Sequence, residues 1–356
     1  MKSIAIYLPS FCGGGAEKVA INLAIGIQEK GHTATLIAVD ATGPLLETIP
    51  KDIPIIDLKC KRVISSISAL IKVLKKNNFT SMISIMTHVN VVANIAGKLT
   101  NTPIISTIHQ TVSERLGTGL KDTIMKLLIK ATYQYSDKII CVSDGSLDDF
   151  NLFFPSLSSR TALIYNPVIP DSPIPLTPPD HNWFSKHKEK PVIISVGRLV
   201  KEKNYLLLLQ AFKQVLQKYD ANLIIFGEGE QRELLESYIT DNDLNESVSL
   251  PGFTNQVLNY VSHADIFALS SISEGLPCAL IEAMSYNKPI VTTNCPSGPR
   301  ELFNDENPAT VVPMNNADEL ANGLLKTLES KDNDVNYPIV RSFTIQRSAE
   351  NYLSYL

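Results

Sequence analysis

Short apolar runs alternate along the chain with longer stretches whose apolar residues recur every three or four positions, the spacing of one helix face. Helices are predicted over residues 17–30 and 64–76, between the apolar runs. Apolar runs bounded by helices are typical of parallel sheets that are buried on both faces. Strands are accordingly predicted over residues 4–8, 34–39, 82–85, 103–108, 138–142, 192–196, 222–226, 266–269 and 289–292.

A proline-rich stretch at residues 166–180 interrupts this rhythm. It carries Pro167, Pro170, Pro173, Pro175, Pro178 and Pro179. Proline has no backbone N–H and a fixed φ, so the stretch is predicted neither to continue a helix nor to pair within a sheet. A chain of 356 residues is long enough for two domains. We therefore predict an α/β protein of two doubly wound, Rossmann-like domains, residues 1–168 and 191–341, with a linker at 169–190 and a ligand cleft between the domains.

Composition and charge narrow the class of protein. The apolar run at residues 4–8 is too short for a signal peptide, and no run is long enough to span a membrane. Five scattered cysteines without a C-x-x-C pair favour the cytoplasm over a disulfide framework or a zinc site. Residues 1–168 carry a formal charge of +5 and the remainder −9. The basic half suits an anionic membrane surface or reflects ordinary surface variation; a nucleic-acid partner is not expected.

Three consecutive glycines, Gly13, Gly14 and Gly15, follow the first predicted strand and open a helix. Glycines let the backbone approach a ligand, and a helix N-terminus favours anions. The spacing matches neither the G-x-G-x-x-G fingerprint nor a Walker A loop. A phosphate or acceptor site is favoured here over a tight turn alone.

A second loop follows the strand at residues 192–196 and contains Gly197, Arg198 and Lys203. A guanidinium and an ammonium group near a strand end suit a diphosphate, whose negative charge grows as its sugar leaves. Without further context, a solvated charged loop is an equally good interpretation of this motif.

The strongest candidate is the loop after the strand at residues 266–269, which leads into a predicted helix. It contains Glu274, Gly275, Leu276 and Pro277, and Glu282 lies on the helix. Pro277 is predicted as an early helical residue. The two carboxylates can accept hydrogen bonds from vicinal sugar hydroxyls, and the backbone N–H groups between them can hold phosphate.

Other candidates lie in the N-terminal half. His109 ends a predicted strand, where a structural role and a role in the site are equally supported. Two basic amphipathic stretches could rest on anionic lipid, although such helices more often pack on a core with a solvated face. The first stretch carries Lys61, Arg62, Lys72, Lys75 and Lys76, and the second carries Lys121, Lys126 and Lys130.

Taken together, these motifs resemble the retaining GT-B glycosyltransferases of glycosyltransferase family four, of the type that builds bacterial surface polysaccharides. The resemblance covers nearly the whole chain. It rests on the glycine loop with Glu17, on Gly197-Arg198 with Lys203-Asn204, and on Glu274 and Glu282 with seven residues between them. Asn166-Pro167-Val168, Gly227-Glu228-Gly229 and residues 295–301 are also similar to family segments.

The resemblance implies a role for each motif. Arg198 and Lys203 would hold the donor diphosphate, Glu274 the sugar hydroxyls and Glu282 the ribose, while Gly14 and Gly15 would lie beside the phosphate or acceptor. His109 matches the histidine near the donor sugar. The C-terminal helix at residues 342–356 would cross back onto the N-terminal domain, which would bind the acceptor.

The expected reaction is the transfer of a hexose or N-acetylhexosamine from a nucleotide diphosphate sugar, a UDP-sugar by family habit, to a polyprenyl-diphosphate-linked or other glycan acceptor. Retention of configuration and independence of metal and cofactor are also implied, with peripheral contact at the inner face of the cell membrane. A non-catalytic sugar-nucleotide sensor and a nucleotide-sugar epimerase remain as alternatives; a dinucleotide-dependent oxidoreductase is disfavoured by the missing fingerprint.

Overall fold

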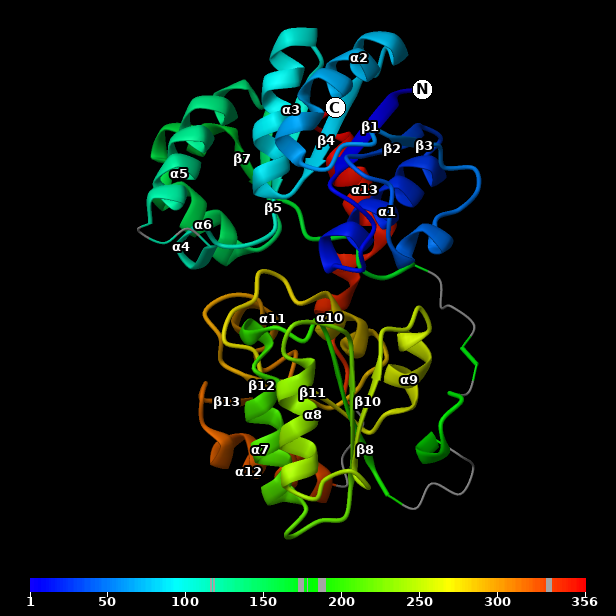
Figure 1. The fold of residues 1–356 in the computed structure, drawn as a ribbon, viewed down its shortest axis with the longest axis vertical. Coiled ribbons are helices and arrows are strands. Elements are labelled where there is room, and N and C mark those ends of the chain that lie inside the picture. The colour runs from blue at the N-terminus through cyan, green and yellow to red at the C-terminus, as the bar shows by residue number, and fades with distance from the viewer. Residues whose placement is uncertain (116, 118, 172–175, 178, 185–189, 331–334) are drawn as a thin grey trace. The chain divides into compact units, whose positions relative to one another are not determined.

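The computed structural model describes residues 1–115, 117, 119–171, 176–177, 179–184, 190–330 and 335–356 (Figure 1). The chain divides into two compact units. Unit 1 comprises Met1–Asp171 together with Ser342–Leu356, and unit 2 comprises Ser172–Arg341. The linker prolines Pro173, Pro175 and Pro178 lie outside the described residues.

Unit 1 is a seven-stranded sheet of parallel strands in the order β3-β2-β1-β4-β5-β6-β7. The order reverses between β1 and β4, which makes this pair the switch point of a doubly wound sheet. Its strands are β1 Ser3–Leu8, β2 Thr33–Ala38, β3 Ile55–Asp57, β4 Ser81–Ile85, β5 Ile104–Ile108, β6 Lys138–Cys141 and β7 Thr161–Leu163. Its helices are α1 Gly15–Glu29, α2 Ile67–Asn77, α3 Thr87–Thr100, α4 Val112–Arg115, α5 Leu120–Thr132, α6 Asp144–Phe153 and α13 Ile345–Leu353.

The C-terminal helix α13 belongs to unit 1, as the sequence predicts. Ala349 and Tyr352 are fully buried in the same apolar cluster as Ala20 and Leu23 of α1. The Lys2 ammonium donates a hydrogen bond to the backbone oxygen of Leu356, so the last residues of the chain lie beside the start of β1. The helix is shorter than the predicted 342–356, because a 3₁₀ turn at Pro338–Phe343 precedes it.

Unit 2 is a six-stranded sheet of parallel strands in the order β10-β9-β8-β11-β12-β13, with its switch point between β8 and β11. Its strands are β8 Val192–Val196, β9 Asn222–Phe226, β10 Val248–Gly252, β11 Ile266–Leu269, β12 Ile290–Thr293 and β13 Thr310–Val312. Its helices are α7 Tyr205–Val215, α8 Arg232–Asp241, α9 Val257–His263, α10 Cys278–Ser285, α11 Pro299–Leu302 and α12 Ala317–Glu329.

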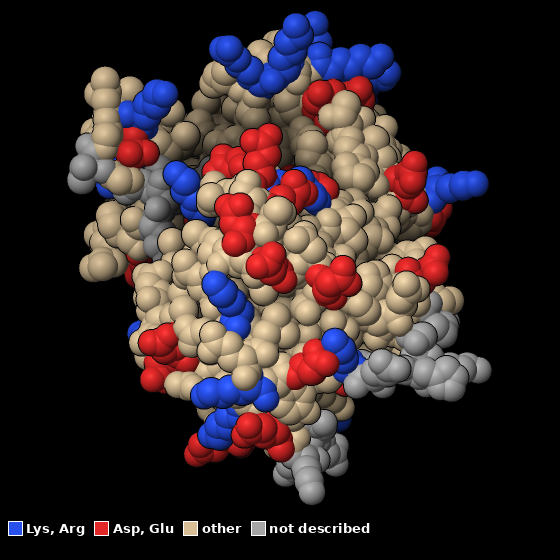
Figure 2. Space-filling model, turned by 60° about the horizontal axis from the view of Figure 1, so that its bottom comes forward, with Lys and Arg blue, Asp and Glu red and all other residues tan. Residues whose placement is uncertain are grey.

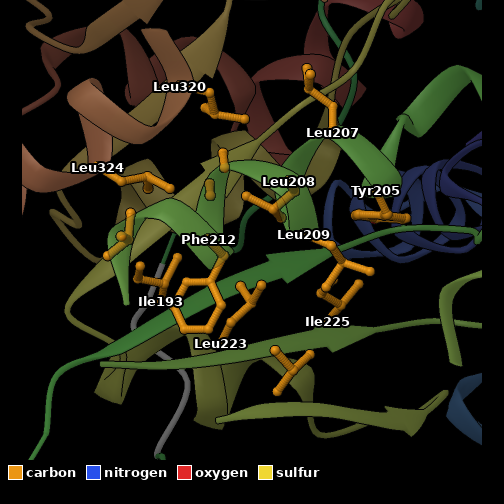
Figure 3. Packing of buried hydrophobic residues seen from close by; sticks show 14 of the residues in the cluster. Ile193, Tyr205, Leu207, Leu208, Leu209, Phe212, Leu223, Ile225, Leu320 and Leu324 are labelled. Carbon is orange, nitrogen blue, oxygen red and sulfur yellow. The ribbon is translucent and has the colours of Figure 1, made fainter. Parts of the chain in front are cut away.

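The core of unit 2 forms where α7 and α12 cover the central strands (Figure 3). Phe212 of α7 lies against Ile193 of β8 and Leu223 of β9, and Leu320 and Leu324 of α12 belong to the same buried cluster. Phe212 is fully buried, so its truncation to alanine would cost about 3–5 kcal/mol. This packing holds β8 rigidly, and β8 carries one of the candidate site loops.

The described residues of the proline-rich stretch belong to neither sheet, in agreement with the prediction. They make one isolated contact: Val168 and Ile169 both donate to the Phe343 oxygen, and Ile169 bridges to Thr344. These two residues keep their N–H groups, which a count of prolines ignores. The strands β3, β7, β10 and β13 were not predicted, because they are short or partly exposed and so give no continuous apolar run.

The surface mixes charges of both signs. Figure 2 shows one face, on which acidic and basic side chains are interspersed over wide uncharged areas and several basic side chains gather at one edge. Within the described ranges, every helix is too short or too polar to cross a lipid bilayer.

Candidate functional site

The strongest cluster of candidate residues lies at the switch point of unit 2. β8 and β11 are neighbouring parallel strands, with Ile193 opposite Ile266 and Ile194 opposite Phe267. Their carboxyl ends therefore meet at one edge of the sheet. The chain leaves β8 into the loop with Gly197 and Arg198, and leaves β11 into the loop with Glu274, so the fold itself brings the two motifs together.

Lys203 and Glu274 form an ion pair across these two loops. Lys203 Nζ lies 2.6 Å from Glu274 Oε1, and the two side chains are only 19% and 9% exposed. The Ser271 hydroxyl donates a second hydrogen bond of 2.6 Å to the same oxygen. Both bonds reach Oε1, so Oε2 of Glu274 makes no hydrogen bond within the part of the chain that the structure describes.

Further hydrogen bonds tie the two loops to each other. The Ser270 hydroxyl donates to the Lys203 backbone oxygen at 2.9 Å, and the Ile272 N–H donates to the Glu202 oxygen at 2.9 Å. The Thr293 hydroxyl, at the end of β12, donates to the Ser271 oxygen. Glu274 and Lys203 are thus positioned by backbone contacts as well as by their own ion pair.

The segment at residues 295–301 supports the same loop from a third strand. The Ser297 hydroxyl donates to the backbone oxygen of Glu274. Gly298 has φ +73°, and a Cβ atom there would lie 2.6 Å from Pro277 Cδ and 3.0 Å from the Gly275 oxygen. Residue 298 must therefore be glycine for the loop to pass this close to Gly275 and Pro277.

Tyr205, the first residue of α7, lies under the ion pair. A Cβ atom on Gly197 would lie 2.8 Å from the Tyr205 hydroxyl and 3.2 Å from Lys203 Cε. Burial, and then the Glu274 carboxylate, raise the pKa of Tyr205. The nearby Ser195 hydroxyl lowers the pKa of Tyr205 by a smaller amount. Ser195 donates its own proton to the Ala268 oxygen. Among the described residues, none makes a hydrogen bond of normal geometry with the Tyr205 hydroxyl.

The helix that follows this loop carries the second carboxylate. α10 begins at Cys278, and Pro277 is its N-cap rather than a helical residue as predicted, with ψ 92°. Glu282 lies in the second turn of α10 and is buried. Leu276, in the loop before the helix, is buried as well. A buried carboxylate just inside a helix whose first N–H groups face the loop suits a ligand with both hydroxyl and phosphate groups.

Arg198 differs from Lys203 in its surroundings. Its side chain is exposed, and its guanidinium makes no hydrogen bond or ion pair with any residue that the structure describes. Gly197, beside it, donates its N–H to the Phe226 oxygen. The structure therefore places one cation of the predicted pair inside the cluster and leaves the other at its solvent edge.

In unit 1, the glycine loop lies at the end of β1, again at the switch point. Gly13 has φ +97°, and Gly14 is the N-cap of α1. A Cβ atom on Gly14 would lie 2.2 Å from Glu17 Oε2, so Gly14 gives room to a buried carboxylate. Two of the three consecutive glycines therefore have a local structural reason: Gly13 has the positive φ of the tight turn that was the alternative interpretation, and Gly14 makes room for Glu17.

His109 follows β5 in unit 1. Its Nε2 lies 2.8 Å from the Thr107 hydroxyl, which donates its own proton to the Ser84 oxygen at 2.8 Å. Thr107 must therefore accept from the histidine, which fixes the neutral tautomer with its proton on Nε2 and a lone pair on Nδ1. Burial lowers the pKa of His109 to about 4, so the ring is neutral at physiological pH.

The first basic stretch packs as an ordinary core-facing helix. Leu70 and Leu74 of α2 are buried, and the basic residues of the stretch are exposed on its other side. These exposed residues are Lys61, Arg62, Lys72, Lys75 and Lys76. Lys126 of α5 donates to the Gly117 oxygen at 3.0 Å.

The structure thus unites Gly197, Lys203, Glu274, Gly275 and Pro277 in unit 2, while Gly14, Gly15 and His109 lie in unit 1. Sequence reasoning gave no role to Ser271, Ser297 and Gly298, which position the Glu274 loop, or to Tyr205, which lies close to the ion pair. Ser271 and Tyr205 fall within a few residues of the motifs, whereas Ser297 and Gly298 lie in the stretch at residues 295–301, noted only for its similarity to a family segment. Among the described residues, no group of His, Cys, Asp and Glu side chains is placed to hold a metal ion.

A fold of two doubly wound domains, with cations and carboxylates at a strand-end switch point, defines a nucleotide-binding α/β protein. Comparison with known families makes this specific. Residues 13–172 match the Glycosyltransferase Family 4 model, and residues 179–338 match the model of Glycosyl transferases group 1. The chain belongs to this family of glycosyltransferases, as its motifs suggest.

Relatives and solved structures agree with this assignment. A Campylobacter jejuni protein named N-acetylgalactosamine-N,N'-diacetylbacillosaminyl-diphospho-undecaprenol 4-alpha-N-acetylgalactosaminyltransferase is 32% identical over 58% of this chain and 54% of its own length. The matched segment thus spans about half of that relative. An uncharacterized glycosyltransferase of Haemophilus influenzae is 28% identical over 91% of this chain and 90% of its own.

Among solved structures, Anabaena Alr3699/HepE in complex with UDP-glucose superposes with a TM-score of 0.83 at 19% identity, covering all of both chains. WaaG, a glycosyltransferase involved in lipopolysaccharide biosynthesis, gives 0.73 at 16% identity, covering 99% of this chain and 95% of its own. These likenesses confirm the predicted GT-B fold.

Proposed function

We propose that this glycosyltransferase transfers a hexose or N-acetylhexosamine from a UDP-sugar to a polyprenyl-diphosphate-linked glycan, with retention of configuration and without a metal ion. The observation that carries the proposal is the Lys203–Glu274 pair, held at the switch point of unit 2. An ammonium and a carboxylate fixed side by side suit a ligand in which a phosphate adjoins sugar hydroxyls.

The roles of the residues follow from their remaining hydrogen-bonding capacity. Lys203 Nζ has three protons and uses one on Glu274, which leaves two for phosphate oxygens. Glu274 Oε2 can accept from a sugar hydroxyl. Arg198, Gly275 and the start of α10 would complete the diphosphate contacts, and Glu282 would bind the ribose. Gly14, Gly15 and His109 would contribute from unit 1.

In the proposed reaction, the bond between the anomeric carbon and the donor phosphate oxygen breaks, and its electron pair goes to the UDP that leaves. The acceptor hydroxyl oxygen forms the new bond to the same carbon and the same face, and its proton goes to a phosphate oxygen. Lys203 and Arg198 would stabilise the charge that develops on the phosphate.

The acceptor class and location rest on the relatives. The Campylobacter jejuni relative is named for a diphospho-undecaprenol-linked substrate, and an Escherichia coli relative, 25% identical over 75% of this chain, is named for a diphosphoundecaprenol-linked one. Such acceptors are lipids, so we place the reaction at the inner face of the cell membrane. All five cysteines are free thiols, which fits a reducing compartment.

The proposal is tested by measuring UDP release from a panel of UDP-sugars, with and without polyprenyl-diphosphate-linked glycans and with EDTA. Release from one donor should rise with acceptor, persist in EDTA and fall at least a hundredfold in Glu274→Gln. Glu246→Gln, the same substitution at an exposed site of unit 2, should leave it unchanged. The anomeric configuration of the product, read by NMR, should match that of the donor.

Three results would contradict the proposal. UDP binding without release from any donor and acceptor would favour a sensor. Conversion of the donor sugar in the absence of acceptor would favour an epimerase. Loss of activity in EDTA that is restored by a divalent cation would refute metal independence.

A further inference from the structure

The second basic stretch, α5 of unit 1, has an unusual distribution of apolar residues. Its inner face is buried, with Ile129 inaccessible and Met125 packed against the same cluster. Its outer face is also apolar: Leu120 is 78% exposed, Leu127 61% and Ile124 48%. A surface helix normally has one apolar stripe and a polar opposite face, so the outer stripe of α5 has no role in the core of unit 1.

The outer residues form one continuous stripe. Leu120, Ile124, Leu127, Leu128 and Ala131 are all exposed, and each lies three or four residues from another of them, which at about 3.6 residues per turn places them on one side of the helix. The last residues of α6, Leu152 and Phe153, are exposed too. They lie near a different side of α5, because Lys126, whose Nζ lies 5.4 Å from the centre of the Phe153 ring, falls away from the stripe by helical spacing.

Lysines border this stripe. Lys121 and Lys130 are exposed and fall on opposite sides of it by helical spacing, whereas Asp122, the one acidic residue of α5, is only partly exposed. Apolar residues bordered by lysines suit the interface of an anionic bilayer, where the lysine stems lie along the acyl chains and the ammonium groups reach the headgroups.

We propose that the outer face of α5 is the surface by which unit 1 docks on an anionic lipid bilayer. This docking surface rests on the proposed function, because it is the lipid-linked acceptor that requires the enzyme to reach a membrane. The position also fits, because α5 is the second helix after β5, and His109 directly follows β5.

Two alternatives are disfavoured: α2 as the membrane-binding helix, and a second copy of the chain as the partner that covers the α5 stripe. The basic face of α2 is exposed, but its leucines Leu70 and Leu74 are in the core, so α2 offers charge without apolar surface. In a symmetric dimer built on the α5 stripe, the lysines of one copy would face those of the other, which disfavours self-association.

The test is flotation of the full chain with vesicles of phosphatidylcholine, with and without phosphatidylglycerol, in the absence of any acceptor. The wild type should float with the anionic vesicles. Leu120→Gln/Leu127→Gln should lower the partition coefficient by at least about tenfold. Lys121→Gln/Lys130→Gln should lower it about twenty-five-fold, at about fivefold per lysine near an anionic surface.

Two control variants match these changes. Leu234→Gln removes an exposed leucine from unit 2, and Lys72→Gln/Lys75→Gln removes the same charge from α2. The leucine control should bind vesicles like the wild type, and the lysine control should lose less than the α5 lysine variant. Circular dichroism melting checks that every variant is folded.

The proposal is overturned if the wild type does not float, or if the α2 variant loses as much as or more than the α5 variants. It is also overturned if light scattering shows a dimer that the α5 variants dissociate. UDP binding, measured in parallel, keeps the two proposals apart. Flotation without UDP binding would refute the proposed function alone, and UDP binding without flotation would refute this surface alone.

Discussion

Breaking the Lys203–Glu274 ion pair should lower the free energy of unfolding by more than the loss of an exposed ion pair would. The two side chains are 19% and 9% exposed, and among the residues that the structure describes the Ser271 hydroxyl is the only other side-chain group hydrogen-bonded to the Glu274 carboxylate. Lys203→Met would leave a nearly buried carboxylate with one hydrogen bond. Removing one partner of a buried pair costs about 3–5 kcal/mol. Because Lys203 is partly exposed to water, which screens the pair, we expect the loss in the free energy of unfolding to be about 2–3 kcal/mol.

A double-mutant cycle isolates the interaction. Lys203→Met, Glu274→Gln and the double variant should give a coupling energy of about 2 kcal/mol, because the double variant leaves no charge behind. The control is Lys190–Asp220, whose atoms lie 2.8 Å apart but whose side chains are 39% and 67% exposed. An exposed pair is screened by water, and its coupling should stay below about 0.5 kcal/mol.

Urea unfolding followed by tryptophan fluorescence is a suitable assay. Trp183 is the single tryptophan and lies in unit 2, as both ion pairs do, so its signal follows the unit in question. The m-value must stay constant across the cycle for the comparison to hold. Equal coupling energies for the two pairs would refute the argument that burial makes the Lys203–Glu274 pair strong.

Three further predictions concern single positions. Gly298→Ala should lower the free energy of unfolding by about 2–3 kcal/mol and weaken UDP binding. The control Gly31→Ala, at φ +78° with no atom within 4 Å of the added Cβ, should lower it by only about 1 kcal/mol. Equal losses of stability would contradict the steric reason. Tyr205→Phe should leave the melting temperature unchanged or raise it, because the hydroxyl is buried without a normal hydrogen bond; a marked loss would reveal a missing partner. The pKa of His109 is lowered to about 4, against about 6.5 when unfolded, so the wild type should lose stability as the pH falls from about 6.5 to 4. His109→Gln should remove about 2 kcal/mol of this loss, seen as a flatter pH dependence of unfolding by circular dichroism; an unchanged slope would refute the assignment.

The sequence predicted those parts of the fold that depend on continuous apolar runs. β8, β9 and β11 lie at the predicted residues, because central strands buried on both faces give an unbroken pattern. β13 gave no such signal, since its middle residue Val311 is 43% exposed at the sheet edge. Edge strands depend on pairing with a neighbour, which the local sequence does not show.

The candidate site was predictable in its charged residues but not in their support. Lys203 and Glu274 stood out as charges in loops after strands, yet their mutual contact depends on β8 and β11 being neighbours, which sequence order does not give. Ser297 binds the Glu274 backbone from a third strand-end loop. Serine and glycine are common in loops, so a supporting role cannot be distinguished from an ordinary turn before the fold is known. For the stretch that forms α5, the sequence left membrane contact and core packing open, because periodicity identifies an apolar face but not the side on which the core lies.

The place of α13 has a consequence for biosynthesis. Unit 1 is built from both ends of the chain, and unit 2 is encoded between them. On the ribosome, the sheet of unit 1 is made first, but the surface of α1 that receives Ala349 and Tyr352 stays uncovered until the residues of α13 leave the exit tunnel. Unit 2 can complete its fold earlier, with all its strands already synthesised. The apolar face of α1 is therefore exposed throughout the translation of unit 2, and in that interval it is the part of unit 1 most open to wrong association.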